Sequence, residues 1–201
     1  MPMPPALILA SASTARADML RAAGVAIEII PARVDESELK LSLKQQGADP
    51  ETAAIALAEL KALQVSRAKP GRLVLGADQM LDCDGAWFDK PENRAAAKTQ
   101  LLSLREKTHR LTSAAVLARD GQRLWHHAAA ARLTMRAFTD PFLELYLDQA
   151  GDAVLNSVGA YQLEGLGAQM FKTIDGDFFT ILGLPLLPVL DILREQNALP
   201  R

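Results

Sequence analysis

The chain has 201 residues, 49% hydrophobic and 23% charged, so it can bury a core without disulfides or a structural metal. Its 22 Lys and Arg residues against 24 Asp and Glu give a formal charge of -2, which leaves no general basic field to hold a nucleic acid. A single cysteine, Cys83, excludes an internal disulfide and a cysteine-rich zinc site, and indicates a reducing compartment.

No segment predicts secretion or membrane insertion. The apolar run at residues 6–10 follows prolines rather than basic residues and is too short for a signal peptide. No stretch approaches the roughly 18 to 20 consecutive apolar residues of a membrane span. We therefore expect a soluble, cytoplasmic protein with a single domain over residues 1–201, and neither a nucleic acid nor a membrane as partner.

Hydrophobic patterning predicts strands that alternate with helices in the first half and hairpins in the second. The predicted elements of the first half are a strand at 6–10, a helix ending near Gly24, a strand at 25–30, helical sequence after Ser37, a helix at 51–69 and a strand at 73–78. Those of the second half are a turn at 82–85, a helix at 92–104 with Pro91 in its first turn, an antiparallel pair at 108–118 and 123–135, a helix at 139–149, short strands within the glycine-rich segment 159–183 and a helix at 186–196. This order predicts an α/β fold with a mixed, twisted sheet and flanking helices.

Three polar residues lie where the first strand meets a helix N-terminus. Backbone N–H groups and the helix dipole favour an anion there, and the hydroxyls of Ser11 and Ser13 with the guanidinium of Arg16 suit a phosphate. The alternative is an N-capping serine and a solvated arginine.

Lys61 falls on the core side of the helix at 51–69, at an angle between Leu57 and Val65. A lysine there either extends its ammonium group outward or is held by an anion. Asp78 follows an apolar strand at its presumed carboxyl end, where ligands collect in open α/β sheets, although it could instead cap a turn. Glu36 offers an oxygen ligand for Mg²⁺, unless it is an ordinary loop acid.

The histidines do not predict a zinc site. His126 and His127 are adjacent, so on a strand they face opposite ways, and His109 has no obvious Cys or His companion.

Five motifs together resemble the Maf family, in the order in which that family carries them. They are LILASASTAR at 7–16, VDE at 34–36, AELKA at 58–62, GADQ at 76–79 and the pair Lys90-Pro91. The match continues through residues 101–104, 108–109, 160–161, 164–168 and 183–186, so it covers nearly the whole chain.

The resemblance implies a fold related to inosine triphosphate pyrophosphatase, with two lobes around a nucleotide cleft, in a protein that is often dimeric. It also implies a nucleoside triphosphate pyrophosphatase that uses a divalent metal, Mg²⁺ or Mn²⁺, to release a nucleoside monophosphate and pyrophosphate. The family was earlier associated with inhibition of septum formation. Position by position, Asp78 is then the general base.

The residue types suit that reaction, because a triphosphate carries several negative charges. The cations Arg16, Lys61 and Lys90 would neutralise phosphate oxygens, while Ser11 and Ser13 would donate hydrogen bonds. Glu36 and Asp78 would hold the metal, and the sequence leaves open whether Asp78 is base or metal ligand.

Three departures from the family pattern bear on substrate choice. Ala15, Gln79 and Glu164 stand where the branch resembling dTTP/UTP pyrophosphatases has Arg, Thr and Gln. Gln79 and Glu164 resemble the branch that acts on 7-methyl-GTP, whose aromatic residue at the position of Ala15 is absent here. A glutamate can accept hydrogen bonds from the N1–H and exocyclic amine of guanine, which favours a guanine nucleotide. The alternatives are a dTTP/UTP pyrophosphatase and a non-catalytic nucleotide-binding regulator of cell division.

Overall fold

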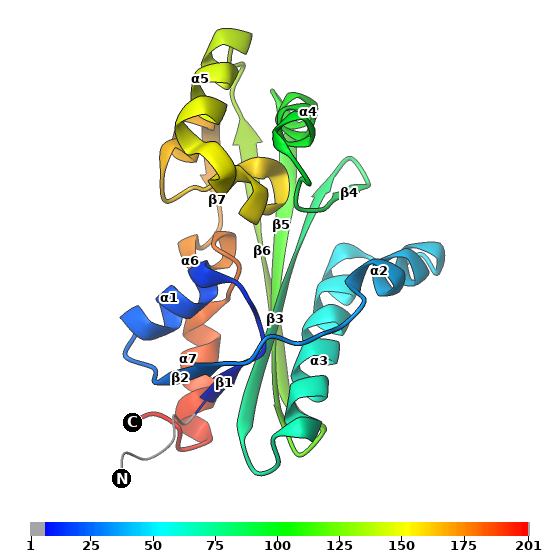
Figure 1. Cartoon of the computed structure of the whole chain (residues 1–201), viewed down its shortest axis with the longest axis vertical. Helices are drawn as coiled ribbons and strands as arrows, with labels where there is room; N and C mark the ends of the chain where they lie inside the picture. The colour runs from blue at the N-terminus through cyan, green and yellow to red at the C-terminus, as the bar shows by residue number, and fades with distance from the viewer. Residues whose placement is uncertain (1–6, 201) are drawn as a thin grey trace. The chain divides into compact units, whose positions relative to one another are not determined.

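The computed structural model describes residues 7–200 (Figure 1). The chain divides into two compact units, of which the first comprises residues up to 79, 113–129 and those from 183 onward, and the second 80–112 and 130–182. Three long strands have one part in each unit: β3 (Leu73–Cys83), β5 (Thr108–Arg119) and β6 (Gln122–Met135).

The strands form the mixed sheet that the sequence predicts, in the order β2-β1-β3-β5-β6-β7, with β4 paired to β3. The remaining strands are β1 (Leu7–Leu9), β2 (Ile27–Ile29), β4 (Ala86–Phe88) and β7 (Phe171–Asp175). β1 runs parallel to both β2 and β3, whereas the β3–β4 and β6–β7 pairs are antiparallel.

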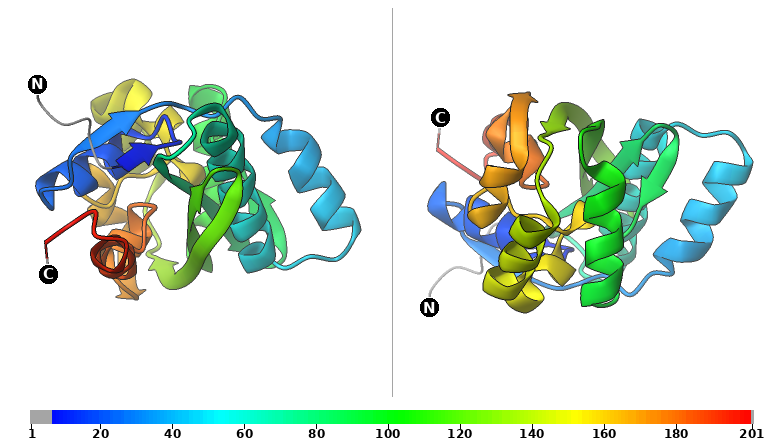
Figure 2. Two further views of the ribbon diagram at one scale, coloured as in Figure 1. Left: turned by 90° about the horizontal axis from the view of Figure 1, so that it is seen from below. Right: turned by 90° about the horizontal axis from the view of Figure 1, so that it is seen from above.

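Four helices belong to the first unit: α1 (Thr14–Ala22), α2 (Glu36–Gln45), α3 (Pro50–Ala68) and α7 (Leu186–Glu195). α3 begins where Asp49 caps it and Pro50 occupies its first turn, and α2 lies beside it (Figure 2). Along α3 the buried residues recur at helical spacing, so one stripe of the helix packs on the core.

Gly76 brings α3 unusually close to β3. A Cβ at this position would lie 2.1 Å from the carbonyl oxygen of Ala58 and 2.8 Å from the backbone nitrogen of Ala62. Only glycine therefore lets the backbones of helix and strand touch here, and Lys61 lies within that same turn of α3.

The second unit buries residues of its helices and strands in one shared core. The helices are α4 (Arg94–Leu104), α5 (Asp140–Ala150), α6 (Phe178–Ile181) and the 3-10 helices η1 (Gly151–Asn156), η2 (Val158–Ala160) and η3 (Leu166–Met170). Leu81, Leu111 and Leu133 of the strands share a core with Leu101 and Leu147 of α4 and α5.

Three local predictions differ from the structure. β3 does not end at Asp78 but continues to Cys83, because Leu81 is buried and pairs with Phe88 of β4. Pro91 is not in the first turn of α4, because the side chain of Asn93 caps the helix two residues later. Segment 159–183 holds 3-10 turns, α6 and a single strand.

Other predicted elements are confirmed to within a few residues. The predicted first strand begins at Ala6, which lies outside the described residues. No helix within residues 7–200 is long and apolar enough to cross a membrane.

Candidate active site

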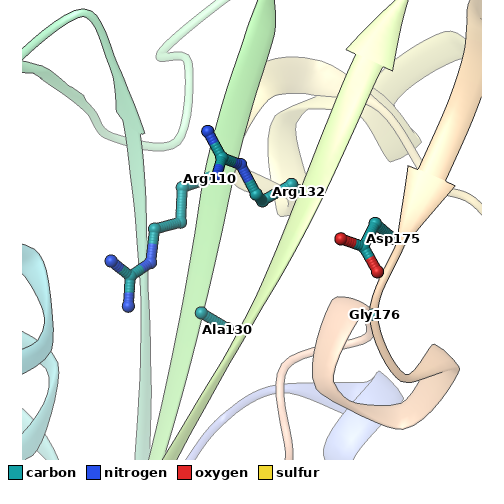
Figure 3. Close-up of a pocket in the computed structure, with 5 residues that line it drawn as sticks. All are labelled: Arg110, Ala130, Arg132, Asp175 and Gly176. Carbon is teal, nitrogen blue, oxygen red and sulfur yellow. The ribbon is translucent and has the colours of Figure 1, made fainter.

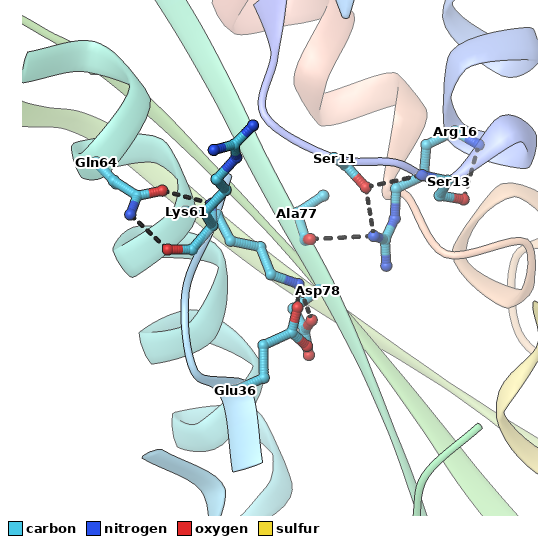
Figure 4. Close-up of polar contacts among 9 residues, drawn as sticks. Ser11, Ser13, Arg16, Glu36, Lys61, Gln64, Ala77 and Asp78 are labelled. Carbon is cyan, nitrogen blue, oxygen red and sulfur yellow. Dashed lines mark hydrogen bonds and ion pairs between the residues drawn. The ribbon is translucent and has the colours of Figure 1, made fainter. Parts of the chain in front are cut away.

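Lys61 of α3 forms an ion pair with each of two carboxylates (Figure 4). Its Nζ lies 2.7 Å from Asp78 Oδ1 on β3 and 2.9 Å from Glu36 Oε1 in the first turn of α2. Lys61 and Asp78 are only 8% and 5% exposed, whereas the side chain of Glu36 is 40% exposed. The core-facing lysine is thus held by anions and does not extend outward.

Asp78 keeps one oxygen unused. Its Oδ2 is buried and has no hydrogen-bond partner among the described residues. Most buried polar atoms are paired, so an unpaired carboxylate oxygen marks a group available for a proton, a water or a metal. Lys61 likewise has one N–H left after its two ion pairs.

The donor set fits a magnesium ion that arrives with its substrate. Mg²⁺ is commonly bound by one or two carboxylates together with waters and substrate phosphates. Glu36 and Asp78 supply two carboxylates, which both contact Lys61, and Oδ2 of Asp78 is an unpaired oxygen that could bind the ion. Within residues 7–200 no cluster of three or more His, Cys, Asp or Glu side chains could hold a metal by itself.

The predicted phosphate residues of α1 also lie together, around a buried arginine. Arg16 is 9% exposed, and its Nε donates to the carbonyl oxygen of Gly183 at 2.8 Å. Its Nη1 donates to Ser11 Oγ and to the carbonyl oxygen of Ala77, both at 3.0 Å. Burial lowers the pKa of Arg16, while the charges of Asp78 and Glu36 raise it. Arg16 is therefore fixed in place, and the solvated alternative is wrong.

Ser13 is the N-cap of α1, as its alternative interpretation predicts, and its Oγ accepts from the Arg16 backbone N–H at 3.4 Å. The Nη2 of Arg16 makes no hydrogen bond within residues 7–200, so two N–H donors remain for an anion. Because Arg16 holds the carbonyl of Ala77, it is tied to the residue directly before Asp78. The arginine and the Lys61–Asp78 pair are thus parts of one arrangement in the first unit.

The residues expected to select the substrate are divided between the units. Ala15 is half-buried in the first turn of α1, and Gln79 Nε2 donates to Ser113 Oγ on β5 at 3.0 Å. Lys90 and Glu164 belong to the second unit, where both are exposed. Lys90 lies between β4 and α4, and Glu164 lies in the turn between η2 and η3.

Sequence reasoning missed the contribution of two residues to this arrangement. Gly76 permits the close approach of α3, and the backbone of Gly183 receives Arg16. The sequence does contain a signal for the close approach at Gly76. Ala58 and Ala62 are small residues four positions apart, on the side of α3 that faces this glycine.

A hollow of about 380 Å³ in the second unit lies apart from these predictions (Figure 3). It is lined by Arg110, Ala130, Arg132, Asp175 and Gly176, none of which the sequence singles out.

Comparison with known proteins decides the family. The family model described as Maf-like protein matches residues 6–196. The chain belongs to the Maf family. A Maf relative from Paramagnetospirillum magneticum (strain ATCC 700264 / AMB-1), named nucleoside triphosphate pyrophosphatase, is 61% identical over 96% of this chain and 99% of its own. Another from Brucella abortus biovar 1 (strain 9-941), named 7-methyl-GTP pyrophosphatase, is 47% identical over 96% of this chain and 97% of its own.

A crystal structure of a nucleoside-triphosphatase, or dITP/XTP pyrophosphatase, from Mycobacterium abscessus covers 96% of this chain and 97% of its own, at 15% identity and a TM-score of 0.43. At that TM-score the likeness adds nothing to the Maf assignment.

Proposed function

We propose that this Maf protein hydrolyses nucleoside triphosphates between the α- and β-phosphates, giving a nucleoside monophosphate and pyrophosphate. The observation that carries the proposal is the buried Lys61–Asp78 pair, with an unpaired carboxylate oxygen and with the guanidinium of Arg16 fixed on the carbonyl of the preceding residue, Ala77. Relatives named as nucleotide pyrophosphatases over nearly the full chain support it.

Asp78 Oδ2 accepts the proton of the attacking water. The water oxygen bonds to one of the two phosphorus atoms that flank the bridging oxygen, and the bond from that phosphorus to the bridge breaks. The electron pair leaves with the pyrophosphate or the monophosphate, depending on which phosphorus is attacked, and the products are the same. Lys61 holds Oδ1 of Asp78, which leaves Oδ2 as the oxygen that can accept this proton.

Cations and hydroxyls of this chain stabilise the phosphate charge. Arg16 offers its two free Nη2 donors and Lys61 its remaining N–H, while Ser11 and Ser13 lie beside the arginine. The family resemblance adds Lys90 as a further phosphate ligand. A bound Mg²⁺ or Mn²⁺, held by Glu36 and Asp78, would supply Lewis-acid stabilisation of charge on the phosphoryl oxygens.

The decisive measurement is pyrophosphate release from 7-methyl-GTP, GTP, UTP, dTTP and CTP, with Mg²⁺ or Mn²⁺ and with EDTA. We expect Asp78→Asn to lower kcat by at least about a hundredfold, as loss of a general base does, and EDTA to stop turnover. Asp82→Asn, which alters another acid of β3, is the matched control and should retain activity. Tight nucleotide binding without turnover by the wild type would instead favour the regulator.

We propose 7-methyl-GTP, or another modified guanine nucleotide, as the preferred substrate. Glu164 is an exposed carboxylate that can accept from the N1–H and amine of guanine, and N7 methylation adds a positive charge that favours it. Several relatives carry the name 7-methyl-GTP pyrophosphatase. Glu164→Gln should shift the preference towards UTP and dTTP, whereas Glu106→Gln, another exposed glutamate of the second unit, should not.

We further propose a single Maf domain over the whole chain, cytoplasmic and homodimeric. The family model, which spans residues 6–196, supports the single domain. Sedimentation at several protein concentrations tests the dimer.

A further inference from the structure

The segment that carries Glu164 is a turn that begins at a buried residue and has an exposed tip. It runs from Tyr161, after η2, to the start of η3, and Tyr161 is only 4% exposed. Glu164, Gly165 and Leu166 form the exposed part. The charge of Glu164 acts on Tyr146 of α5, whose pKa burial raises to about 12 with Glu164 adding to the shift. Glu164 is therefore an exposed residue that lies close enough to the buried Tyr146 hydroxyl to act on its pKa.

Backbone contacts close this turn on itself. The N–H of Gly165 donates to the carbonyl oxygen of Gln162 at 3.3 Å, and that of Ala168 to Gly165 at 3.1 Å. A Cβ on Gly167 would lie 2.5 Å from the oxygen of Gln162, so the two sides of the turn are in direct contact. The position of Glu164 then depends on how the base of the turn is held.

His109 of β5 holds that base. Its Nε2 lies 2.6 Å from the Tyr161 hydroxyl, and the imidazole is 2% exposed. Phe171 packs against both rings, with centroids 4.8 Å from Tyr161 and 6.1 Å from His109. One buried hydrogen bond inside an aromatic cluster thus links the turn to the sheet.

The direction of this hydrogen bond follows from the protonation states. Burial lowers the pKa of His109 to about 4 and raises that of Tyr161 well above its usual value, so both are neutral near pH 7. His109 Nδ1 is buried without a partner among the described residues. If His109 donated, the Tyr161 hydroxyl proton would also need an acceptor. The lower cost is for Tyr161 to donate to Nε2, which leaves the proton of the ring on Nδ1.

We propose that His109 and Tyr161 are positioning residues for base recognition, which set the place of Glu164 through the buried hydrogen bond at the base of its turn. This role rests on the proposed function, in which Glu164 reads the base. It leaves the chemical step untouched, because Asp78, Lys61 and Arg16 belong to other segments of the chain.

Three variants separate positioning from general stability. Tyr161→Phe removes only the hydroxyl and keeps the ring against Phe171, while His109→Leu removes the acceptor and His109→Gln retains one. Thr180→Val is the control, because Thr180 is itself buried and the change removes a partly buried side-chain hydrogen bond of the second unit, the one from Thr180 Oγ1 to Asp177 at 2.8 Å.

The measured quantity is the ratio of kcat/KM for 7-methyl-GTP to that for UTP. We expect Tyr161→Phe and His109→Leu to lower this ratio about tenfold, the scale of one buried hydrogen bond, through a higher KM for 7-methyl-GTP at unchanged kcat. His109→Gln should recover most of it, and Thr180→Val should lower only the melting temperature. A Tyr161→Phe enzyme that is less stable but equally selective overturns the proposal.

Amide hydrogen exchange keeps this test separate from that of the proposed function. Tyr161→Phe should speed exchange at Gly165 and Ala168 about tenfold while leaving α3 unchanged. If the wild type releases no pyrophosphate from any nucleotide, the proposed function is wrong, and exchange alone decides whether the hydrogen bond positions the turn. Unchanged exchange at Gly165 and Ala168 would overturn it in either case.

Discussion

Lys61 links the stability of the candidate site to its proposed chemistry. Its ammonium group is buried between Asp78 and Glu36 and balances their charge, which makes an otherwise costly buried aspartate tolerable. The same contact leaves Asp78 Oδ2 without a partner. The protein thus contains one buried carboxylate whose second oxygen is left unpaired, and the proposed general base needs such an oxygen.

Removing this lysine should destabilise the protein because it leaves a buried charge alone. We expect Lys61→Met to lower the free energy of unfolding by about 3 to 5 kcal/mol. Adding Asp78→Asn should restore much of that loss without restoring turnover. Urea unfolding and pyrophosphate release on the single and double variants measure the two effects, and equal stability of Lys61→Met and wild type would contradict the argument.

The buried imidazole of His109 makes stability depend on pH. The pKa of His109 is about 4 in the folded protein, against 6.5 for an ordinary histidine such as that of the unfolded chain. Between pH 4 and pH 6.5, therefore, only the unfolded chain binds this proton. Its contribution is complete above pH 6.5 and is lost as the pH falls towards 4, by up to about 3 kcal/mol. Urea titrations of wild type and His109→Gln between pH 7 and 4 should show the steeper loss in the wild type. Parallel curves would mean that the ring protonates freely.

At the scale of elements, the contact between α3 and β3 forms the candidate site. Gly76→Ala would place a methyl group against backbone atoms of Ala58 and Ala62, so α3 must move away from the strand. We expect a loss of about 3 kcal/mol and of most activity, because Lys61 moves with the helix.

Truncating Ala58 should not rescue Gly76→Ala, because the carbonyl oxygen of residue 58 remains. Gly165→Ala is the control for stability, since its nearest neighbour, the oxygen of Gln162, is 4.0 Å away. Thermal unfolding of Gly76→Ala, of Gly76→Ala with Ala58→Gly, and of Gly165→Ala tests this. The first two should have similarly lowered melting temperatures, and Gly165→Ala should melt close to the wild type.

The sequence is sufficient to predict the bounds of α3, but not the residues that α3 contacts. The helix predicted at 51–69 agrees with α3, Pro50–Ala68, to within one residue at each end. The ion pair from Lys61 to Asp78 depends on packing around Gly76, which no local pattern contains. The predicted end of β3 at Asp78 is wrong. A buried strand rarely contains an unpaired carboxylate, but here Lys61 of α3 pairs with Asp78 and the strand continues to Cys83.

The prediction of short strands in the glycine-rich segment 159–183 is wrong for a different reason. Its apolar residues favour strands, but Gly159 and Ala160 both have positive φ, at 77° and 61°, which breaks any extended run. The roles of Asp78, Arg16 and Glu36 came from the Maf resemblance together with the chemistry of phosphate. The contacts of Arg16 with Ala77 and Gly183 needed the structure.

At the scale of the whole molecule, two compact units share three strands. β3, β5 and β6 each continue from one unit into the other, so neither unit has a complete sheet of its own. We expect the chain to unfold in a single transition for this reason.

Each unit contains one tryptophan, Trp125 in the first and Trp87 in the second. The variants Trp87→Phe and Trp125→Phe therefore report on one unit each by fluorescence. After correction for the small stability change of each variant, their urea midpoints should coincide. Two separate midpoints would show that the units unfold independently.

The closed turn between η2 and η3 has a consequence for how such an enzyme diversifies. Its backbone contacts are internal, and its base is held by two aromatic rings and an imidazole, so the exposed tip can change its side chains without disturbing the fold. Asp78, the proposed base, lies on β3, which the tip does not help to build. On the roles proposed above, new base preferences can therefore arise by substitution at two or three tip positions, while the residues proposed for hydrolysis stay unchanged.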